Sequence, residues 1–192
     1  MLDFFQQIDL SVFTFINHWT HPTWLVDVAL FFTNLGTWGG IWILIALAIA
    51  IWGKKKGFRT FWLVITALII DVALNEYLIK LAVNRPRPYQ TIGLTGLDFW
   101  DVKWVDSSFL SGHAFTAFAC AYIIGKRYPK HAWLVWVMGV LIAFSRIYLG
   151  AHWPSDVLLG AGLGLFVGWL IVFIENKYFV KEDQLNKKSK KQ

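Results

Sequence analysis

The segment from Val157 to Ile174 contains no charged residue. A helix that crosses a bilayer needs about 17 to 25 mostly apolar residues, and this run is long enough. Four earlier stretches have a similar apolar character. We therefore predict an all-α, polytopic transmembrane helix bundle with five membrane spans, near residues 37–53, 58–80, 112–126, 131–150 and 154–174.

The composition agrees with a membrane protein and excludes several other classes. Of the 192 residues, 57% are hydrophobic and 16% charged, whereas an average soluble domain carries about 25% charged residues. A single core of this size cannot bury so much apolar material, so the excess must face lipid. The same figures exclude a disordered chain and a nucleic-acid-binding arm. Cys120 is the single cysteine, which excludes an internal disulfide.

The last predicted span carries Gly160, Gly164 and Gly168 at intervals of four residues. Residues with this spacing lie on one face of a helix. A ridge of small residues allows another helix to approach closely. We therefore predict that this face packs against a second helix.

Lysine and arginine are distributed unevenly about the predicted spans. Most lie in the loops after the first and third spans or after the fifth span. Cytoplasmic segments are enriched in these residues, so we predict a cytoplasmic C-terminus that ends in a basic, disordered tail, 181–192. The remaining cations lie at the opposite ends of the spans, where this bias does not account for them; they are Lys80, Arg85, Arg87, Lys103 and Arg146.

Two N-terminal segments are expected to be helical but differ from the five spans. Residues 3–18 place apolar and polar side chains at helical spacing, as in a helix that lies in the membrane interface. A second helix, 22–35, has about 14 residues and a length of roughly 21 Å, so it either spans at a tilt or lies half immersed. We predict one membrane-embedded domain, 1–180, with these first helices in 1–36 and a core in 37–175.

The longest polar segment runs from Arg85 to about Ser111, on the predicted non-cytoplasmic side. Its Arg-Pro-Arg-Pro beginning cannot continue a helix, because each proline removes a donor and restricts the residue before it. Ser111-Gly112-His113 then opens the next span. Free N–H groups at a helix N-terminus favour an anion.

Further polar residues are predicted to reach the same membrane face. Lys80 ends the second span and Arg146 the fourth, while His152 and Asp156 flank the beginning of the fifth. Clustered cations repel one another, and an anionic ligand such as a phosphate would relieve that repulsion. Two histidines beside a phosphate can supply a nucleophile and an acid. Asp156 could orient the His152 imidazole.

Some of these polar residues also allow a second interpretation. Two histidines and an aspartate could bind zinc, but three nearby cations would repel it.

Within the second span, Glu76 is one turn before Lys80 and is expected to pair with it. Asp71, about 180° around the helix, is expected to face another helix.

The polar residues form three motifs in a fixed order: Lys80-(six residues)-Arg87-Pro88, Ser111-Gly112-His113 and Ser145-Arg146-(five residues)-His152-(three residues)-Asp156. This pattern resembles the signature of the type 2 phosphatidic acid phosphatase superfamily, which includes lipid phosphate phosphatases and vanadium haloperoxidases. The resemblance covers roughly residues 37–175. The chain departs from it at Leu110, where the motif usually has proline, and in lacking a clear first span.

The resemblance implies an integral membrane enzyme that removes a terminal phosphate from a lipid. His152 would attack phosphorus and form a phosphohistidine, Asp156 would orient it, and His113 would protonate the leaving oxygen. Water would then hydrolyse the intermediate, with no metal and no other cofactor. The phosphate would be held by Lys80, Arg87, Ser111, the Gly112 N–H and Arg146.

The motifs read only the phosphate, so several lipids are candidate substrates: undecaprenyl diphosphate, phosphatidylglycerol phosphate, phosphatidic acid and lipid A 1-phosphate. Two alternatives stay open, a phosphotransferase that passes the phosphoryl group to a second lipid and a transporter or scaffold without turnover.

Short loops and the lack of appended domains favour a bacterial inner-membrane protein with its site on the non-cytoplasmic face. We predict no nucleic-acid partner, and the sequence indicates no oligomeric state.

Overall fold

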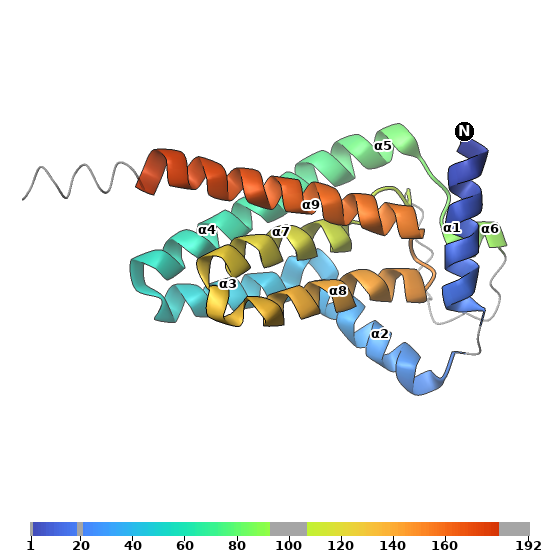
Figure 1. Cartoon of the computed structure of the whole chain (residues 1–192), viewed down its shortest axis with the longest axis horizontal. Helices are drawn as coiled ribbons and strands as arrows, with labels where there is room; N and C mark the ends of the chain where they lie inside the picture. Colours follow the sequence, from blue (N-terminus) through green and yellow to red (C-terminus); the bar gives the residue numbers. More distant parts are fainter. Residues whose placement is uncertain (1, 19–20, 93–106, 181–192) are drawn as a thin grey trace, which may run out of the picture.

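A computed structural model describes residues 2–18, 21–92 and 107–180, and this part of the chain is almost entirely helical. Figure 1 shows long helices running side by side, with α1 lying across one end of the bundle. The helices in chain order are α1 (Leu2–Asn17), α2 (Thr23–Gly36), η1 (Thr37–Gly39), α3 (Gly40–Trp52), α4 (Lys54–Asp71), η2 (Val72–Ile79), α5 (Lys80–Val83), α6 (Pro88–Ile92), α7 (Gly112–Arg127), η3 (Pro129–His131), α8 (Ala132–Tyr148), α9 (Pro154–Glu175) and η4 (Asn176–Val180).

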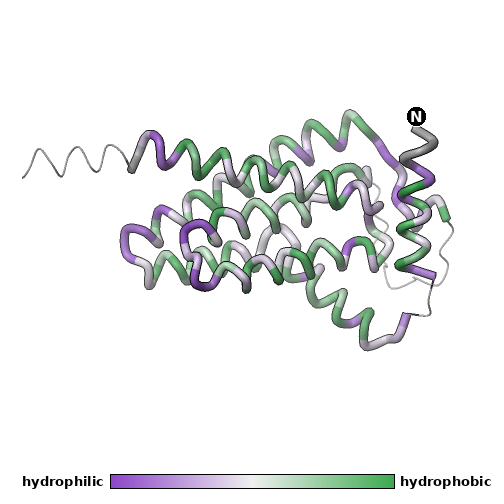
Figure 2. The backbone as a smooth tube through the Cα atoms, in the orientation of Figure 1, coloured by the Kyte–Doolittle hydropathy of each residue, from purple (hydrophilic) through white to green (hydrophobic). Residues whose placement is uncertain are grey.

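Hydrophobic residues predominate along the length of the bundle, and hydrophilic residues gather at the turns between helices (Figure 2). Within the described residues, four helical segments are long and apolar enough to cross a membrane: Thr23–Trp52, Lys54–Ile92, Pro129–Tyr148 and Pro154–Tyr178. The expected span 37–53 is the second half of the first segment. There α2 continues through η1 into α3, with a kink at Trp38 and Gly39, which both have positive φ angles.

The expected span 112–126 corresponds to α7, which has 16 residues and is not among these four segments. It is the central helix, packed against α9, α8 and α4. Its side chains, including Phe115 and Cys120, are mostly buried. Because protein surrounds α7, it needs no long apolar surface of its own. A fifth membrane crossing by this helix stays a prediction.

The glycine ridge of α9 packs against α7, as predicted. A Cβ atom at Gly164 would lie 2.2 Å from the carbonyl oxygen of Phe115, and one at Gly160 would lie 2.7 Å from that of Ser111. These distances leave no room for a side chain. The close approach places the beginning of α7 beside the beginning of α9, where the Ser111 N–H donates to the Asp156 carbonyl at 3.2 Å.

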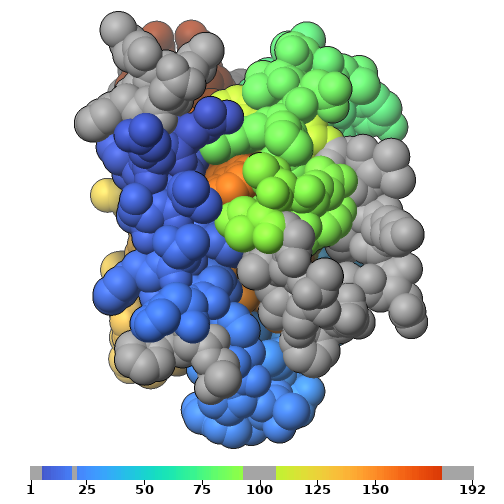
Figure 3. Space-filling model, turned by 90° about the vertical axis from the view of Figure 1, so that its right-hand side faces the viewer, coloured from blue at the N-terminus to red at the C-terminus, as the bar shows by residue number. Residues whose placement is uncertain are grey.

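Helix α1 crosses the end of the bundle where α8 ends and α9 begins, beside α6 (Figure 3). Its Asp9 is buried and accepts a hydrogen bond from the Ser155 N–H at 2.8 Å. Phe13 packs edge-on against Trp153, with 5.5 Å between ring centroids. The interfacial position of α1 and the two alternatives for α2 stay predictions, and the predicted tail, 181–192, lies outside the described residues.

Candidate active site

Most of the predicted site residues meet at one cavity of about 310 Å³. They come from four parts of the chain that the bundle brings together: the η2–α5 helix, the segment after it, the beginning of α7, and the end of α8 with the turn that follows it. The rest of the wall is mixed: it includes the apolar side chains of Trp38, Leu68 and Val72 and the carboxylates of Asp71 and Glu76. Six of the eight predicted residues line the cavity, namely Lys80, Arg87, Gly112, His113, Arg146 and His152.

His152 lies in the α8–α9 turn and is buried. Its Nδ1 atom is 2.6 Å from the Ser108 carbonyl oxygen. Since a carbonyl can only accept, Nδ1 carries the proton and Nε2 keeps its lone pair. Nε2 lies 3.3 Å from Nη1 of Arg87. Burial, and then the Arg87 and Arg146 charges, hold the pKa of His152 well below its ordinary value, so the imidazole is neutral at physiological pH.

Asp156 makes no direct hydrogen bond to His152 within the described residues, and its predicted role in orienting this imidazole stays a prediction. Its carboxylate accepts from the Ser108 hydroxyl at 2.5 Å and from the Trp153 N–H at 3.1 Å. Asp156 lies in the first turn of α9, so its side chain turns back toward the residue before the helix. The connection to His152 therefore passes through Ser108, whose hydroxyl binds Asp156 and whose carbonyl binds Nδ1.

Arg85 completes this arrangement, although sequence reasoning assigned it no function. Its Nη1 donates to Asp156 at 2.5 Å and its Nη2 donates to Asp9 of α1 at 2.6 Å. Ser155 also donates to Asp9 through its hydroxyl, at 2.5 Å. One indication that Arg85 has a function was present in the sequence: it is one of the cations that lie away from the predicted cytoplasmic side.

Arg87 is almost completely buried and is held by backbone carbonyls. Its Nη1 donates to the Ala151 carbonyl at 2.8 Å, and its Nη2 donates to the Ser107 carbonyl at 3.3 Å. These bonds fix the guanidinium beside His152. A planar group held in this way is suited to bind phosphate oxygens in a defined geometry.

Thr33 of α2 contacts two of the predicted site residues. Its hydroxyl accepts from Nη1 of Arg146 at 2.5 Å, and its carbonyl oxygen lies 3.1 Å from Nε2 of His113. Because the carbonyl accepts, Nε2 carries a proton, and Nδ1 is the other titrating nitrogen. The sequence contained no signal for Thr33, since α2 lies outside the three motifs.

The beginning of α7 provides the remaining predicted residues. Ser111 caps the helix by accepting from the Ala114 N–H at 3.4 Å; it is fully buried and is not among the residues that line the cavity. Gly112 lines the cavity. As the first residue of α7, it has an N–H without an acceptor inside the helix. A Cβ atom there would lie 3.1 Å from Nδ2 of Asn75, so only glycine fits easily.

The predicted ion pair between Lys80 and Glu76 is present, with 2.7 Å between Nζ and Oε1. Asp71 faces α7, as predicted, but it also lines the same cavity as Lys80, which corrects its expected position about 180° around the helix. The reason is η2, a π-helical segment over Val72–Ile79. Its wider turns bring residues five apart near one another, so Asp71 and Glu76 both face the cavity.

Comparisons with known proteins agree with this arrangement. The chain matches the family model described as the PAP2 superfamily over residues 60–179. It is 29% identical over 143 residues to undecaprenyl-diphosphatase of Sulfolobus acidocaldarius, covering 74% of this chain and 67% of that protein. It is 33% identical over 170 residues to phosphatidylglycerophosphatase B of Bacillus subtilis, covering 80% and 77%.

A solved structure has the same fold. The crystal structure of a transmembrane PAP2-type phosphatidylglycerolphosphate phosphatase from Bacillus subtilis matches with a TM-score of 0.66 and 28% identity. The match covers 90% of this chain and 87% of that one. The family match includes every predicted site residue, from Lys80 to Asp156. The chain is therefore an integral membrane phosphatase and belongs to the PAP2 superfamily.

Proposed function

We propose that this chain hydrolyses a terminal phosphate from a membrane lipid through a phosphohistidine at His152. The observation that supports this most directly is the position of the unprotonated Nε2 atom of His152. It lies 3.3 Å from Nη1 of Arg87, and both residues line the cavity. A lone pair beside a fixed guanidinium can attack a phosphorus atom whose oxygens the guanidinium binds.

The phosphate oxygens are bound by Arg87, Arg146, Lys80 and the Gly112 N–H. Arg87 and Arg146 are buried and held by oxygen atoms of the protein, so they need no reorganisation as charge develops. Ser111 contributes by capping α7 and keeping the Gly112 N–H in place. These groups supply the charge stabilisation that a divalent ion supplies elsewhere, so the proposed reaction uses no metal and no other cofactor.

His113 is the proposed acid for the leaving oxygen. Its Nε2 atom is engaged by the Thr33 carbonyl, so the proton is transferred from Nδ1. The neutral ring that remains keeps its hydrogen bond to Thr33. In the second step the same nitrogen can accept a proton from the water that attacks phosphorylated His152. Asp156 acts on His152 through Ser108.

The cavity favours a lipid whose phosphate enters and whose tail stays in the bilayer. Beside the polar groups its wall includes Trp38, Leu68 and Val72, and Trp38 and Val72 are exposed. Undecaprenyl diphosphate and phosphatidylglycerol phosphate are the first candidate substrates, because the relatives named above act on them by their names. Phosphatidic acid and lipid A 1-phosphate complete the panel.

We further propose one membrane-embedded domain, 1–180, because α1 contacts Ser155 and α2 contacts both His113 and Arg146.

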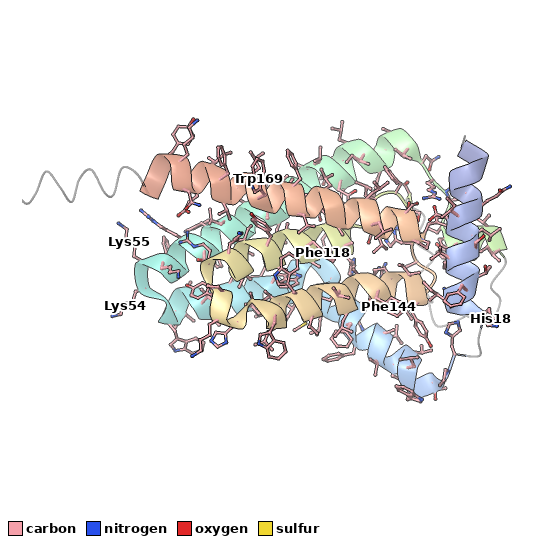
Figure 4. The ribbon with its side chains drawn as sticks, in the orientation of Figure 1. His18, Lys54, Lys55, Phe118, Phe144 and Trp169 are labelled. Carbon is pink, nitrogen blue, oxygen red and sulfur yellow. The ribbon has the colours of Figure 1, made fainter. Side chains whose placement is uncertain are left out.

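The proposed orientation in the membrane follows from the lysines. Lys54 and Lys55 lie at the end of the bundle away from α1 (Figure 4). The positive-inside bias places that end in the cytoplasm, together with the C-terminus, and the cavity on the non-cytoplasmic face. A bacterial inner membrane is the proposed location.

The test is phosphate release by the purified protein from each lipid of the panel, with His152→Ala as the control. We expect release from at least one lipid, none with His152→Ala, and no loss of activity in a metal chelator. Transfer of phosphate to a second lipid would indicate a phosphotransferase instead. Lipid binding without release would indicate a transporter or scaffold. Activity lost to chelator and restored by Zn²⁺ or Mg²⁺ would contradict the metal-independent mechanism.

A further inference from the structure

A second cavity, of about 440 Å³, lies at the end of the bundle away from α1. It opens between the beginning of α4, the end of α7 and the end of α9. None of the described residues that line it is acidic. Five of them are cationic: Lys55, Lys56, Arg59, Lys126 and Arg127. Figure 4 shows Lys54 and Lys55 at this end, and Figure 2 shows the same turn as hydrophilic.

The beginning of α4 adds to the positive potential. The first turn of a helix carries partial positive charge, so lysines there are unfavourable and an anion is favourable. Helix α4 nevertheless begins with Lys54, Lys55 and Lys56 and has no acidic residue in its first turn. Its N-cap residue, Gly53, has no side chain that could cap the helix. The sequence therefore lacks the negative group that this helix end favours.

Arg127 is fixed at the wall of the cavity by groups from two other helices. Its Nη1 donates to Glu175 at 2.9 Å, its Nε to the Thr60 hydroxyl at 3.1 Å, and its Nη2 lies 3.5 Å from the Lys56 carbonyl. Both side chains of the Arg127–Glu175 pair are largely buried. A guanidinium held in this way can bind an anion without losing much conformational freedom.

We infer that this cavity binds the phosphate of an anionic phospholipid head group. Exposed tryptophans lie at this end of the bundle, with Trp52 at the end of α3 and Trp133 at the beginning of α8. Tryptophan is enriched at the membrane–water interface, which puts the cavity at the depth of lipid head groups. A basic pocket between membrane helices at that depth is suited to an acidic lipid. The bound lipid would join α4, α7 and α9.

Phosphatidylglycerol and phosphatidylcholine with the same acyl chains are the probes, titrated into the purified protein in a neutral detergent. Binding is measured by native mass spectrometry and by the shift in melting temperature. We expect phosphatidylglycerol to bind and to raise the melting temperature more than phosphatidylcholine does. A Lys55→Gln/Lys56→Gln variant should bind it at least about tenfold more weakly, since each basic residue near an acidic lipid contributes about 1 kcal/mol.

Two control variants separate binding in this cavity from general charge attraction and from binding at the candidate active site. Lys54→Gln/Lys130→Gln removes the same charge from the same end without altering the cavity wall, and it should keep the wild-type affinity. Arg87→Ala alters the candidate active site and should also keep the wild-type affinity for phosphatidylglycerol.

Three results would overturn the inference: equal binding of both lipids, an equal loss of affinity in the matched control, or a loss confined to Arg87→Ala. Competition by millimolar inorganic phosphate would do so too, by indicating a site for a soluble anion. Circular dichroism confirms that each variant is folded.

Discussion

Nη1 of Arg146 donates a 2.5 Å hydrogen bond to the hydroxyl of Thr33, a residue 113 positions earlier in the chain. The carbonyl oxygen of the same Thr33 accepts from His113 at 3.1 Å. Thr33 is buried in α2, and it contacts both a proposed phosphate ligand and the proposed acid. Helix α2 therefore positions groups that the three sequence motifs provide.

Thr33→Val should lower kcat/KM by about ten- to a hundredfold. The substitution keeps the shape of the side chain and the carbonyl contact with His113, but it removes the acceptor of a charged donor, which is worth about 1.5 to 3 kcal/mol. Arg146 would then be held less firmly in the position in which it meets the phosphate. The measurement is steady-state kinetics on the lipid, together with the inhibition constant of vanadate, which mimics five-coordinate phosphorus.

Thr33→Ser is the matched control, because it restores the hydroxyl and loses only a methyl group. It should recover most of the activity and of the vanadate affinity. If both variants lose activity equally and melt at the same lowered temperature, then Thr33 serves in packing and does not position Arg146.

Asp156→Asn should reduce kcat by about ten- to a hundredfold. In a triad where the acid holds the imidazole directly, the equivalent change costs about 10⁴, because the wrong tautomer is then favoured. Here the Ser108 carbonyl determines the tautomer of His152, and Asp156 is connected to His152 through the Ser108 hydroxyl, which it binds. The smaller loss follows from that difference, and single-turnover rates measure it.

Ser108→Ala tests the same connection from its other side. It should reduce kcat about as much as Asp156→Asn, and the double variant should lose little more, since both changes break one connection. A loss near 10⁴ for Asp156→Asn alone would mean that Asp156 contacts His152 directly during turnover.

The site residues that sequence could predict are those in the three motifs. Lys80, Arg87 and Arg146 are cations at the ends of the predicted spans opposite to most of the lysines and arginines, and their predicted clustering indicated a shared anion. The glycine ridge of α9 likewise predicted a close helix contact, which α7 provides. In these cases the residue type itself limits what the position can do: a cluster of cations favours an anion, and a row of glycines allows a close helix contact. Such positions can be interpreted from the sequence alone.

The residues that sequence could not predict depend on long-range packing or on irregular helix geometry. Thr33 meets Arg146 only because α2 packs against α8. Asp71 lines the cavity because η2 is π-helical, whereas the prediction assumed the spacing of an α-helix. Asp156 reaches Ser108 instead of His152 because the first turn of α9 directs its side chain. Each of these depends on angles between elements, which a local pattern does not contain.

Gly164→Ala should lower the melting temperature by several degrees. The new Cβ atom would lie 2.2 Å from the Phe115 carbonyl oxygen, so α7 and α9 would have to separate, and overpacking of this kind costs about 1 to 3 kcal/mol. Gly162→Ala is the control on the same helix, because a Cβ atom there meets nothing within 4 Å. Thermal unfolding in detergent should show no decrease for Gly162→Ala. Equal melting temperatures for both variants would contradict the proposed packing.

The two histidines should respond differently to the leaving group. His152→Ala should abolish turnover of every substrate, because the bond from Nε2 to phosphorus can no longer form. His113→Ala should lower the rate on a lipid phosphate by about 10²- to 10⁴-fold, the usual contribution of a general acid, because a lipid alkoxide leaves poorly without a proton. A nitrophenolate leaves unaided, so the same variant should keep much more of its activity on nitrophenyl phosphate.

The decisive quantity is the ratio of the two activities in each variant. His113→Ala should shift this ratio strongly toward nitrophenyl phosphate, and it should accumulate phosphorylated His152 if the Nδ1 atom also assists the attacking water. The modified residue can be detected by mass spectrometry after rapid quenching. His152→Ala should show neither effect. Equal losses for both variants on both substrates would mean that His113 binds the phosphate and transfers no proton, and the contact of its Nε2 with Thr33 would then only position the ring.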